Sequence, residues 1–476
     1  MSVRTCVVAL ALAGCTATEP TDAADTDTTT GTPGGPPASY TFDSRFATGT
    51  SSVSYSGQTF RHLLMHDLDA YLGGLTLEID TGFFPAPGEI VDALDFYFDF
   101  DSATSGGVPH SFTSQPAPVQ VTYGEVSSGR TLVEKIAGND PEGQHEDWST
   151  AFVGWTQAGV TTPESLVRTW FAEIETIATD RASGLVATGP DGEPMASVVL
   201  SPDGLHRAEL LQKFMWAAIA FSQGADDYLD DDLPGSGLLA SNATAEEGEP
   251  YSALEHGWDE GFGWFGAARD YAAWPDELLD GDAYADTYDP DGAIDLFSEV
   301  SWGHARYAGK RDLGAVVPTD FSGEAFSAFR DGRALIASTD GELDSTALDE
   351  LRAHRDAAIG TWEKAIAASV VHYANETLAD MTKFGSDDYE FVEHAEHWSE
   401  LKGFALSFQF NPRSVIDDAT FAELHALVGM GPALPADPQE TIDAYHDDLI
   451  AARTMIGDAF DFADENLGDD DGAGGW

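Results

Sequence analysis

Residues 251–271 carry the densest set of potential ligand side chains in this chain, in the order YSALEHGWDEGFGWFGAARDY. On a helix, Glu255 and Asp259 are i,i+4 neighbours, and so are His256 and Glu260. Carboxylates combined with imidazole suit divalent metal ions such as Mn, Fe or Zn. The segment therefore predicts a metal site. Taken alone, the pattern also fits a helix with a polar face and an aromatic core stripe.

A second pair of potential ligands opens a strongly amphipathic stretch. In GLHRAE, residues 204–209, His206 and Glu209 are three positions apart and share one helix face. His304 stands in the motif WGHARY, ahead of a basic run at 310–311. That run fits a site for an anionic ligand, but in so acidic a chain we favour pairing with acidic neighbours. His206, Glu209 and His304 are the candidates to complete the metal site from other helices.

Another possible cluster combines two helical stretches. One stretch has three candidates spaced three residues apart, His394, His397 and Glu400. A separate helix has His372 and Glu376, which are one turn apart. Metal sites inside helical bundles use carboxylates and imidazoles from facing helices. Separate surface histidines explain the pattern equally well.

Residues 287–298 have the spacing of an EF-hand-type calcium loop, with glycine at the sharp turn. Such a loop closes with a bidentate glutamate at its twelfth position, where this chain has serine, with Glu299 one place later. A modified Ca²⁺ loop and a simple acidic turn both fit. The oxygen ligands would come from Thr287, Asp289, Asp291 and Asp295.

Helices are the elements that must position these side chains. Apolar residues recur at helical spacing along most of the chain. The segments 82–88, 102–123 and 184–203 are rich in Pro, Gly and Ser and predict long loops with at most one short hairpin. The sequence thus predicts an all-α fold, one large helical-bundle body. The expected helices are 58–71, one opening at Thr162-Pro163, 205–221 ending at 222–224, 345–383, 389–410 and 441–466.

The net charge and the absence of several motifs exclude some partners and some enzyme classes. The 476 residues include 83 acidic and 22 basic side chains, a formal net charge of −61. Nucleic acid and anionic headgroups would be repelled, so neither is expected as a partner. The charge suits a saline habitat or cationic ligands. The sequence contains no G-x-S-x-G, P-loop or His-Glu-x-x-His motif, which argues against serine hydrolases, P-loop enzymes and ordinary zinc proteases.

The start of the chain has the layout of a secretory signal, with Arg4 before an apolar run at 7–12. The ending Leu12-Ala13-Gly14-Cys15 resembles the bacterial lipobox, which implies cleavage before Cys15 and acylation of its thiol, for example with palmitate. An ordinary cleaved signal is the alternative. The apolar run is too short to span a membrane.

This interpretation predicts an anchored protein of the cell envelope, with the outer membrane as its expected site. The chain has only one other cysteine, Cys6, so no disulfide or cysteine ligand is expected after cleavage. The predicted divisions are a signal peptide at 1–14, a lipidated cysteine with a disordered tether at 15–39, a helical domain at 40–466 and an acidic, Gly-rich tail at 467–476.

Several stretches together resemble an uncharacterised family of bacterial lipoproteins, a domain of unknown function related to the imelysin-like helical proteins. The resemblance implies a helical, extracytoplasmic protein linked with iron acquisition, and some imelysin-like proteins carry a peptidase label. Gly204, His206 and Glu209 match the Gly-x-His-x-x-Glu pattern of imelysins. The stretches that carry the resemblance are SYSGQT at 54–59, EHGWDEGFGWF at 255–265, DGAIDL at 291–296, 303–311, WEK at 362–364 and 403–412.

Three functions follow as hypotheses. The first is a lipid-anchored binding protein that holds a metal ion or metal-containing ligand during uptake, with Fe, Zn, Mn or Ca as candidate ions. The second is a metal-dependent peptidase in which Glu260 acts as general base; with no complete hydrolase motif, we favour binding over catalysis. The third is a structural or interaction protein of the envelope. Convergence of the candidate ligands in space would favour the first two, and separation would favour the third.

Overall fold

The computed structural model describes residues 36–190 and 192–476, and the fold of that part is all-α, as predicted. The predicted signal, Cys15 and most of the tether lie outside it. No extended strand occurs in the described residues, and the loops expected to hold at most one hairpin contain isolated β-bridges, at Pro109–Thr122 and Thr188–Pro194.

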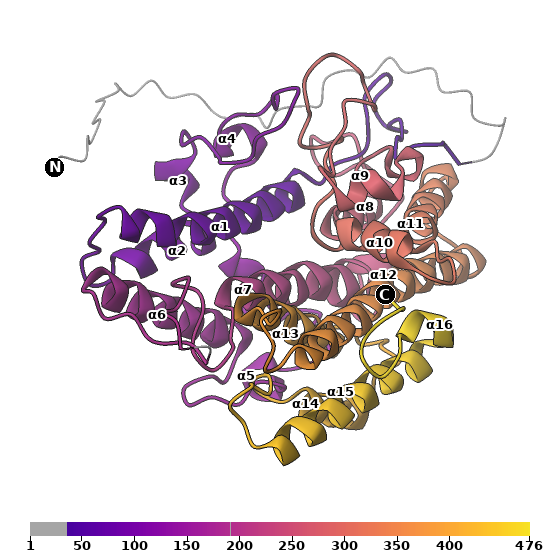
Figure 1. The fold of residues 1–476 in the computed structure, drawn as a ribbon. Coiled ribbons are helices and arrows are strands. Elements are labelled where there is room, and N and C mark those ends of the chain that lie inside the picture. The colour runs from indigo at the N-terminus through magenta and orange to yellow at the C-terminus, as the bar shows by residue number, and fades with distance from the viewer. Residues whose placement is uncertain (1–35, 191) are drawn as a thin grey trace.

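Figure 1 shows the order and arrangement of the helices. Their bounds in the first half are α1 Ser56–Asp80, α2 Glu89–Phe98, α3 Ser102–Ser105, α4 Tyr123–Val126, α5 Trp148–Ala151, α6 Pro163–Ala182, α7 Arg207–Met215 and α8 Ala253–Phe265. They continue with α9 Asp276–Asp280, α10 Gly303–Gly314, α11 Phe321–Ser338, α12 Ser345–Thr382, α13 Phe391–Ala405, α14 Asp418–Val428, α15 Gln439–Phe460 and α16 Asp464–Leu467.

Helix α12 is the longest described helix, and four others pack along it. Its 38 residues span roughly 57 Å at 1.5 Å per residue. It begins where the Asp344 carboxylate accepts hydrogen bonds from the N–H groups of Thr346 and Ala347. Helices α10, α11, α13 and α15 contact it (Figure 1). The prediction of a helix at 345–383 is therefore confirmed.

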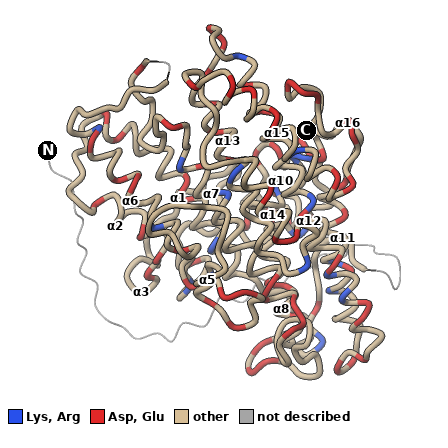
Figure 2. Tube along the Cα trace, turned by 90° about the horizontal axis from the view of Figure 1, so that it is seen from below, with Lys and Arg blue, Asp and Glu red and all other residues tan. Residues whose placement is uncertain are grey.

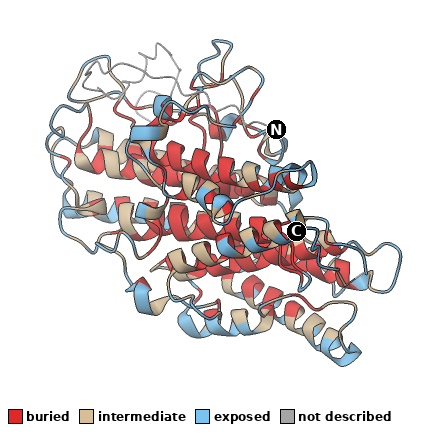
Figure 3. Cartoon of the chain, turned by 90° about the vertical axis from the view of Figure 1, so that its left-hand side faces the viewer, coloured by how far each residue is buried: buried red, intermediate tan, exposed pale blue. Residues whose placement is uncertain are grey.

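Helices α1, α2 and α6 form a smaller group that packs against α7. Helix α6 begins as predicted, because the Thr162 side chain accepts a hydrogen bond from the Ser165 N–H and Pro163 occupies the first turn. Helix α7 also contacts α13. Figure 3 shows that the helices in the middle of the body are mostly buried, whereas exposed residues gather at loops and outer faces. Helix α7 thus joins the two groups of helices.

The chain beyond α7 continues as π-helix, which the sequence analysis missed. The segments Trp216–Phe221 and Gly224–Tyr228 both have π-helical hydrogen bonding. Gly224 was expected to help end the helix, but a Cβ atom there would lie 2.8 Å from the Trp362 ring. Glycine at this position therefore allows close packing and does not terminate the helix. π-Helical turns are rare and occur often at functional sites.

The acidic, Gly-rich segment at 467–476 folds back onto the body. The indole of Trp476 is 5% exposed, and its Nε1 donates a hydrogen bond to the Arg311 carbonyl. The Asn375 side chain donates to the Trp476 carbonyl oxygen. These contacts attach the segment to α10 and α12.

Acidic side chains are distributed over the whole body and not confined to one face, as Figure 2 shows. No helix in the described residues is long and apolar enough to cross a membrane.

Candidate functional site

Two of the four candidate ligands on α8 meet a guanidinium instead of an open metal position. Arg333 of α11 donates from Nε to Asp259 Oδ1 at 2.8 Å and from Nη1 to Glu255 Oε1 at 3.2 Å. All three side chains are fully buried. Arg333 therefore supplies the positive charge that these carboxylates require.

Polar neighbours complete this group, which we call the Arg333 network. Tyr40 Oη donates to Asp259 Oδ1 at 2.9 Å, and Arg45 Nε donates to Glu255 Oε1 at 3.2 Å. Burial raises the pKa of Asp259 despite the nearby guanidinium. Burial acts in the same direction on Glu255, but Arg333 and the Ser252 N–H outweigh it and lower the pKa. The network holds α8 and α11 together.

The other two candidate ligands of α8 lie apart from the network. His256 Nε2 is 3.7 Å from Glu260 Oε2, and the His256 ring stacks on Tyr251 at 4.5 Å. Glu260 also accepts a hydrogen bond from Gln58 Nε2 at 3.0 Å. The structure therefore separates the predicted four-residue metal site into two pairs with different partners.

His304 lies in an aromatic part of the core, away from both pairs. Its ring centroid is 5.8 Å from those of Trp216 and Trp362. Neither ring nitrogen has a hydrogen-bond partner in the described residues. Burial lowers the pKa of His304 to about 3, so the imidazole is neutral at physiological pH. In the basic run after it, Lys310 pairs internally as we favoured, with Nζ 3.4 Å from Asp280 Oδ1, whereas Nε of Arg311 has no hydrogen-bond partner among the described residues.

Polar side chains from three helices meet where α7 packs against α13, and we call this group, together with the nearby charge of Asp69 on α1, the α7–α13 cluster. Glu209 and Lys213 come from α7 and His206 from its N-cap position; Glu396 and Glu400 come from α13 and Tyr307 from α10; Asp69 acts on the group through its charge. The sequence analysis named His206, Glu209 and Glu400 in separate hypotheses, and it missed the other four. The i,i+4 spacing of Glu209 and Lys213 was the available signal.

Lys213 stands at the centre of the cluster and is only 2% exposed. Its Nζ lies 2.7 Å from Glu209 Oε2 and 2.9 Å from Glu400 Oε1. Burial disfavours the charged amine, but Glu209 and Glu400 outweigh it and raise the pKa of Lys213. The lysine is therefore an ammonium ion inside the protein.

The remaining carboxylates of the cluster have no cation in contact. Asp69 has no hydrogen bond or ion pair with another described residue, and burial, followed by repulsion from Glu209, raises its pKa to about 6. The nearest basic group to Glu396 is His206, with Nε2 3.5 Å from Oε1, and burial lowers the pKa of that imidazole. Two carboxylates thus contact the Lys213 ammonium, and the other two contact no cation.

The five residues of the other predicted helical cluster do not come together. His397 pairs with Asp380, Nδ1 to Oδ2 at 2.8 Å. His394 is fully buried against Phe384, and its ring nitrogens have no partner among the described residues. Glu400 belongs to the α7–α13 cluster. His372 packs edge-on against the neighbouring Tyr373 ring, and Glu376 acts on His397 only through its charge.

In the predicted calcium loop the carboxylates face the loop's own backbone. Glu299 Oε1 accepts a hydrogen bond from the Tyr288 N–H at 3.3 Å, and Oε2 accepts from the Asp295 N–H at 2.9 Å. Asp295 accepts from Gln120 Nε2 at 2.9 Å. Among residues 36–190 and 192–476, no group of three or more His, Cys, Asp or Glu side chains is placed to hold a metal ion.

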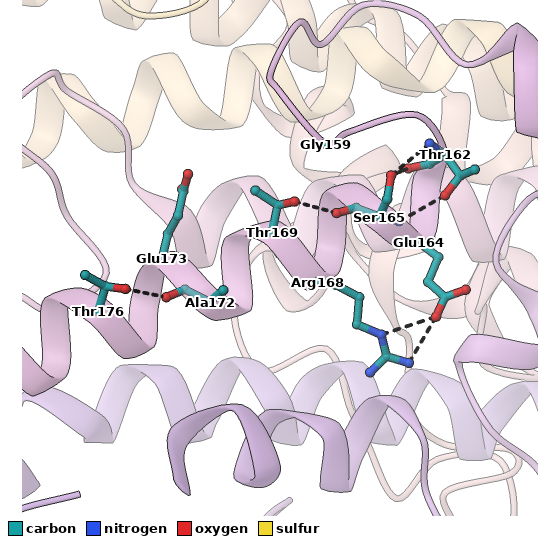
Figure 4. Close-up of a pocket in the computed structure, with 9 residues that line it drawn as sticks. All are labelled: Gly159, Thr162, Glu164, Ser165, Arg168, Thr169, Ala172, Glu173 and Thr176. Carbon is teal, nitrogen blue, oxygen red and sulfur yellow. Dashed lines mark hydrogen bonds and ion pairs between the residues drawn. The ribbon is translucent and has the colours of Figure 1, made fainter. Parts of the chain in front are cut away.

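A surface hollow of about 620 Å³ follows the outer face of α6 (Figure 4). Apart from Gly159, its lining comes from α6 and its N-cap residue Thr162. Thr169 and Thr176 donate hydrogen bonds to carbonyls of their own helix. The hollow therefore brings no polar groups together from different elements, unlike the α7–α13 cluster.

The model of a protein family described as "Domain of unknown function (DUF4856)" matches residues 151–427, more than half of the chain, and the chain therefore belongs to this family. The match includes both α7 and α13. No curated protein and no solved structure matches the chain.

Proposed function

We propose that this member of the DUF4856 family is a lipid-anchored, extracytoplasmic binding protein whose ligand is a cation held at the α7–α13 cluster. The charge imbalance of the cluster supports this proposal. Glu209 and Glu400 share Lys213, whereas Asp69 and Glu396 contact no cation. Arg311 adds positive charge only at longer range from Glu400. An added cation would relieve the repulsion among these carboxylates.

A metal ion is the ligand that the imelysin resemblance implies, and the cluster fits it poorly as described. Direct coordination needs three or more ligands in reach of one ion, and the described residues contain no such group. The backbone N–H of Glu209 points at His206 Nδ1 at 3.4 Å. The neutral His206 ring then carries its proton on Nε2, the nitrogen that faces Glu396. A cation held by charge and hydrogen bonds fits these groups better.

Binding measurements test the proposal directly. Calorimetric titration of the purified protein at low ionic strength would use Mn²⁺, Fe²⁺, Zn²⁺, Ca²⁺ and an alkyl diamine. At least one should bind, and the double variant Asp69→Asn, Glu396→Gln should weaken that binding at least tenfold. Glu393→Gln is the matched control, because Glu393 is exposed on α13, one turn before Glu396. If every cation binds equally well to the double variant, the proposal is wrong.

The anchor is a separate part of the proposal and rests on the lipobox-like Cys15. The described body has no membrane-spanning helix, so stable membrane attachment would come from acyl chains. Cys15→Ala should move the protein from the membrane fraction to the soluble fraction of expressing cells. Mass spectrometry of the mature N-terminus should find an acylated Cys15. An unmodified, membrane-bound protein would contradict this part.

The structural alternative is a second candidate, and the Arg333 network favours it. Glu255 and Asp259, which lie in one of the stretches that carry the family resemblance, join two helices and face no solvent. If no cation binds to the purified protein, an envelope scaffold becomes the better proposal.

A further inference from the structure

The N-terminus of α10 is buried and has no capping side chain. Gly303, His304 and Ala305 are all buried, and no described group accepts a hydrogen bond from their N–H groups; the first N–H of α10 with a partner is that of Arg306, which donates to the Trp302 carbonyl at 3.3 Å. Gly303 has φ +44°, and a left-handed residue before helical ones turns successive N–H groups toward one point. Buried N–H groups without partners are rare, and a helix N-terminus favours an acceptor oxygen or a negative charge.

The imidazole of His62 on α1 faces this helix end. A Cβ atom on Gly303 would lie 3.5 Å from His62 Cε1 and 3.6 Å from His62 Nδ1. His62 is 3% exposed, and its Nδ1 has no hydrogen-bond partner among the described residues. Its Nε2 lies 3.2 Å from the carbonyl oxygens of Gly263 and Trp264, and because carbonyls only accept, Nε2 carries the proton. Burial lowers the pKa of His62 to about 4, so the ring is neutral and Nδ1 is an acceptor.

These two groups define the hydrogen bonds that a ligand must make. It must accept from the N–H groups of residues 303–305 and donate to His62 Nδ1. Chloride has no proton to donate and would need a charged imidazolium, which burial disfavours. A carboxylic acid meets both requirements, since its carbonyl oxygen accepts and its O–H donates. Its pKa, about 4.3 for a glutamic acid side chain, is close to that of His62, so the two groups can share one proton.

Aromatic side chains adjoin the same position. The Gly303 Cβ position lies 3.6 Å from Trp216 Cδ1, and the His62 ring is nearly parallel to the Trp302 ring at a centroid distance of 6.4 Å. Trp302 is 7% exposed and also contacts the partly exposed His66. The alkyl part of a short acid would therefore contact aromatic carbon atoms.

Titratable side chains around this site come from the helices that pack there. They include Arg61, His66, Asp67 and Asp69 on α1, Lys213 on α7, Glu260 on α8 and His304 on α10. Arg61, Asp67 and Glu260 have hydrogen-bond partners of their own. Burial lowers the pKa of His304, and the charge of Lys213 lowers it further. Among the described residues, the charge that acts on this helix end is therefore positive, and the first turn of α10 has no acidic side chain to oppose it.

We propose that the N-terminus of α10 and His62 bind a small monocarboxylate together with one proton. The carbonyl oxygen of the acid accepts from the N–H groups of residues 303–305, and its O–H donates to His62 Nδ1. This anion site goes beyond the proposed function and does not depend on it, since the proposed cation is held at the α7–α13 cluster.

The first experiment titrates the full-length protein calorimetrically with sodium acetate and with sodium chloride at equal ionic strength. Acetate should bind at least tenfold more tightly at pH 5.5 than at pH 7.5, because each bound carboxylate brings a proton. At pH 6.0, buffers with different ionisation enthalpies should show uptake of about one proton per acetate bound. Chloride should bind at least tenfold more weakly than acetate.

A second experiment uses a matched pair of variants. His62→Phe removes Nδ1 but keeps a ring, and it should weaken acetate binding at least tenfold and abolish its pH dependence. His394→Phe is the control, because His394 is also fully buried, lacks partners for both ring nitrogens among the described residues and has a pKa that burial lowers to about 4. It should change acetate binding less than twofold.

Each contrary outcome overturns a stated part of the proposal. Acetate binding without proton uptake, or chloride binding as tight as that of acetate, overturns the ligand class. Acetate binding that is unchanged in His62→Phe overturns the assignment to α10. No binding of either anion to the wild type overturns the whole proposal and leaves water as the partner of these N–H groups. If His62→Phe does not fold, proton uptake by the wild type and the comparison with chloride decide. None of these results affects cation binding at the α7–α13 cluster.

Discussion

The Arg333 network and the α7–α13 cluster are both buried groups of opposite charges between helices, but they differ in how completely the charges are balanced. Around Arg333, two carboxylates are shared with one internal guanidinium, and Tyr40 and Arg45 complete their hydrogen bonds. Around Lys213, two carboxylates share one ammonium, two further carboxylates contact no cation, and some of the side chains reach solvent.

This contrast separates a structural role from a binding role. A network in which each carboxylate is paired with an arginine has no capacity for a further cation, whereas a cluster with unpaired carboxylates at a partly exposed edge does. Both groups contain residues that looked like metal ligands in the sequence. The types of residue in the two groups therefore did not distinguish a structural role from a binding role. The number of buried cations that pair with the carboxylates did.

The largest effect is expected at Arg333. Arg333→Met would leave Glu255 and Asp259 buried without their main cation, which should cost about 3–5 kcal/mol of unfolding free energy. Urea denaturation measures this loss. Arg352→Met is the control, since Arg352 pairs at the surface with Asp349 and should cost less than about 1 kcal/mol. Equal losses would show that the Arg333 network is no more important than a surface pair.

A smaller loss is expected from Lys213→Met, about 1–3 kcal/mol by the same measurement. Glu209 and Glu400 lose an ammonium, but they keep some contact with solvent, and the pKa of Glu209, which Lys213 lowers against the effect of burial, would rise without that ammonium. The loss should therefore shrink as the pH falls from 8 to 5. Lys310→Met is the control, because the Asp280 carboxylate with which Lys310 pairs is half-exposed. A loss of unfolding free energy larger than that of Arg333→Met would show that the Lys213 ammonium stabilises the fold more than Arg333 does.

The pH dependence of Asp69 gives the third test. Its pKa is raised to about 6 in the folded protein, first by burial and then by Glu209; Glu400 adds to this repulsion, while Lys213 and His66 oppose it. The folded state thus holds this proton more tightly than the unfolded state. The Asp69 contribution to stability is therefore present at low pH and is lost as the pH rises from about 4 through 6.

Replacement by an uncharged amide isolates this effect. At pH 8, Asp69→Asn should be about 1–2 kcal/mol more stable than the wild type, and at pH 4.5 the difference should be clearly smaller. Thermal or urea unfolding at both pH values checks the difference. A variant that is less stable at pH 8 would mean that the ionised Asp69 already has a cationic partner, and the cluster would then resemble the Arg333 network.

The smallest effect is expected at His304. Its two ring nitrogens lack partners among the described residues, so His304→Phe removes unsatisfied polar atoms and keeps a ring in the aromatic core. The unfolding free energy should stay within about 1 kcal/mol of the wild type, and cation binding should be unchanged. A loss above about 2 kcal/mol would indicate a bound partner at the imidazole.

Sequence reasoning succeeded where the signal is local. The Thr162-Pro163 cap predicted the start of α6, and the helical pattern across 345–383 predicted α12, because caps and periodicity act within one element. The π-helical turns after α7 escaped prediction, since apolar residues at helical spacing do not specify which carbonyl each N–H reaches.

The candidate site was harder to predict because partners come from distant parts of the chain. Arg333 lies 78 residues from Glu255 in sequence and Glu400 lies 93 residues from Tyr307. A helix face shows which residues of one helix are neighbours, but the neighbouring helix decides whether a carboxylate meets an arginine, a lysine or no cation. Glu255 and Glu209 therefore looked alike in the sequence and differ in the fold.

The π-helical turns from Trp216 to Tyr228 determine how the side chains after them are oriented relative to those of α7. Each residue of an α-helix advances the side-chain direction by about 100°, and a π-helical turn contains an additional residue. Deleting one residue between Trp216 and Phe221 would therefore let the segment relax to α-helix and leave the later side chains near their present directions. One inserted residue would instead rotate the later side chains by about 100°, so that Phe221 and Gly224 would miss Trp362, while Lys213, which lies before the insertion, would keep its direction. Loss of one residue at this segment is therefore expected to be tolerated better than gain of one.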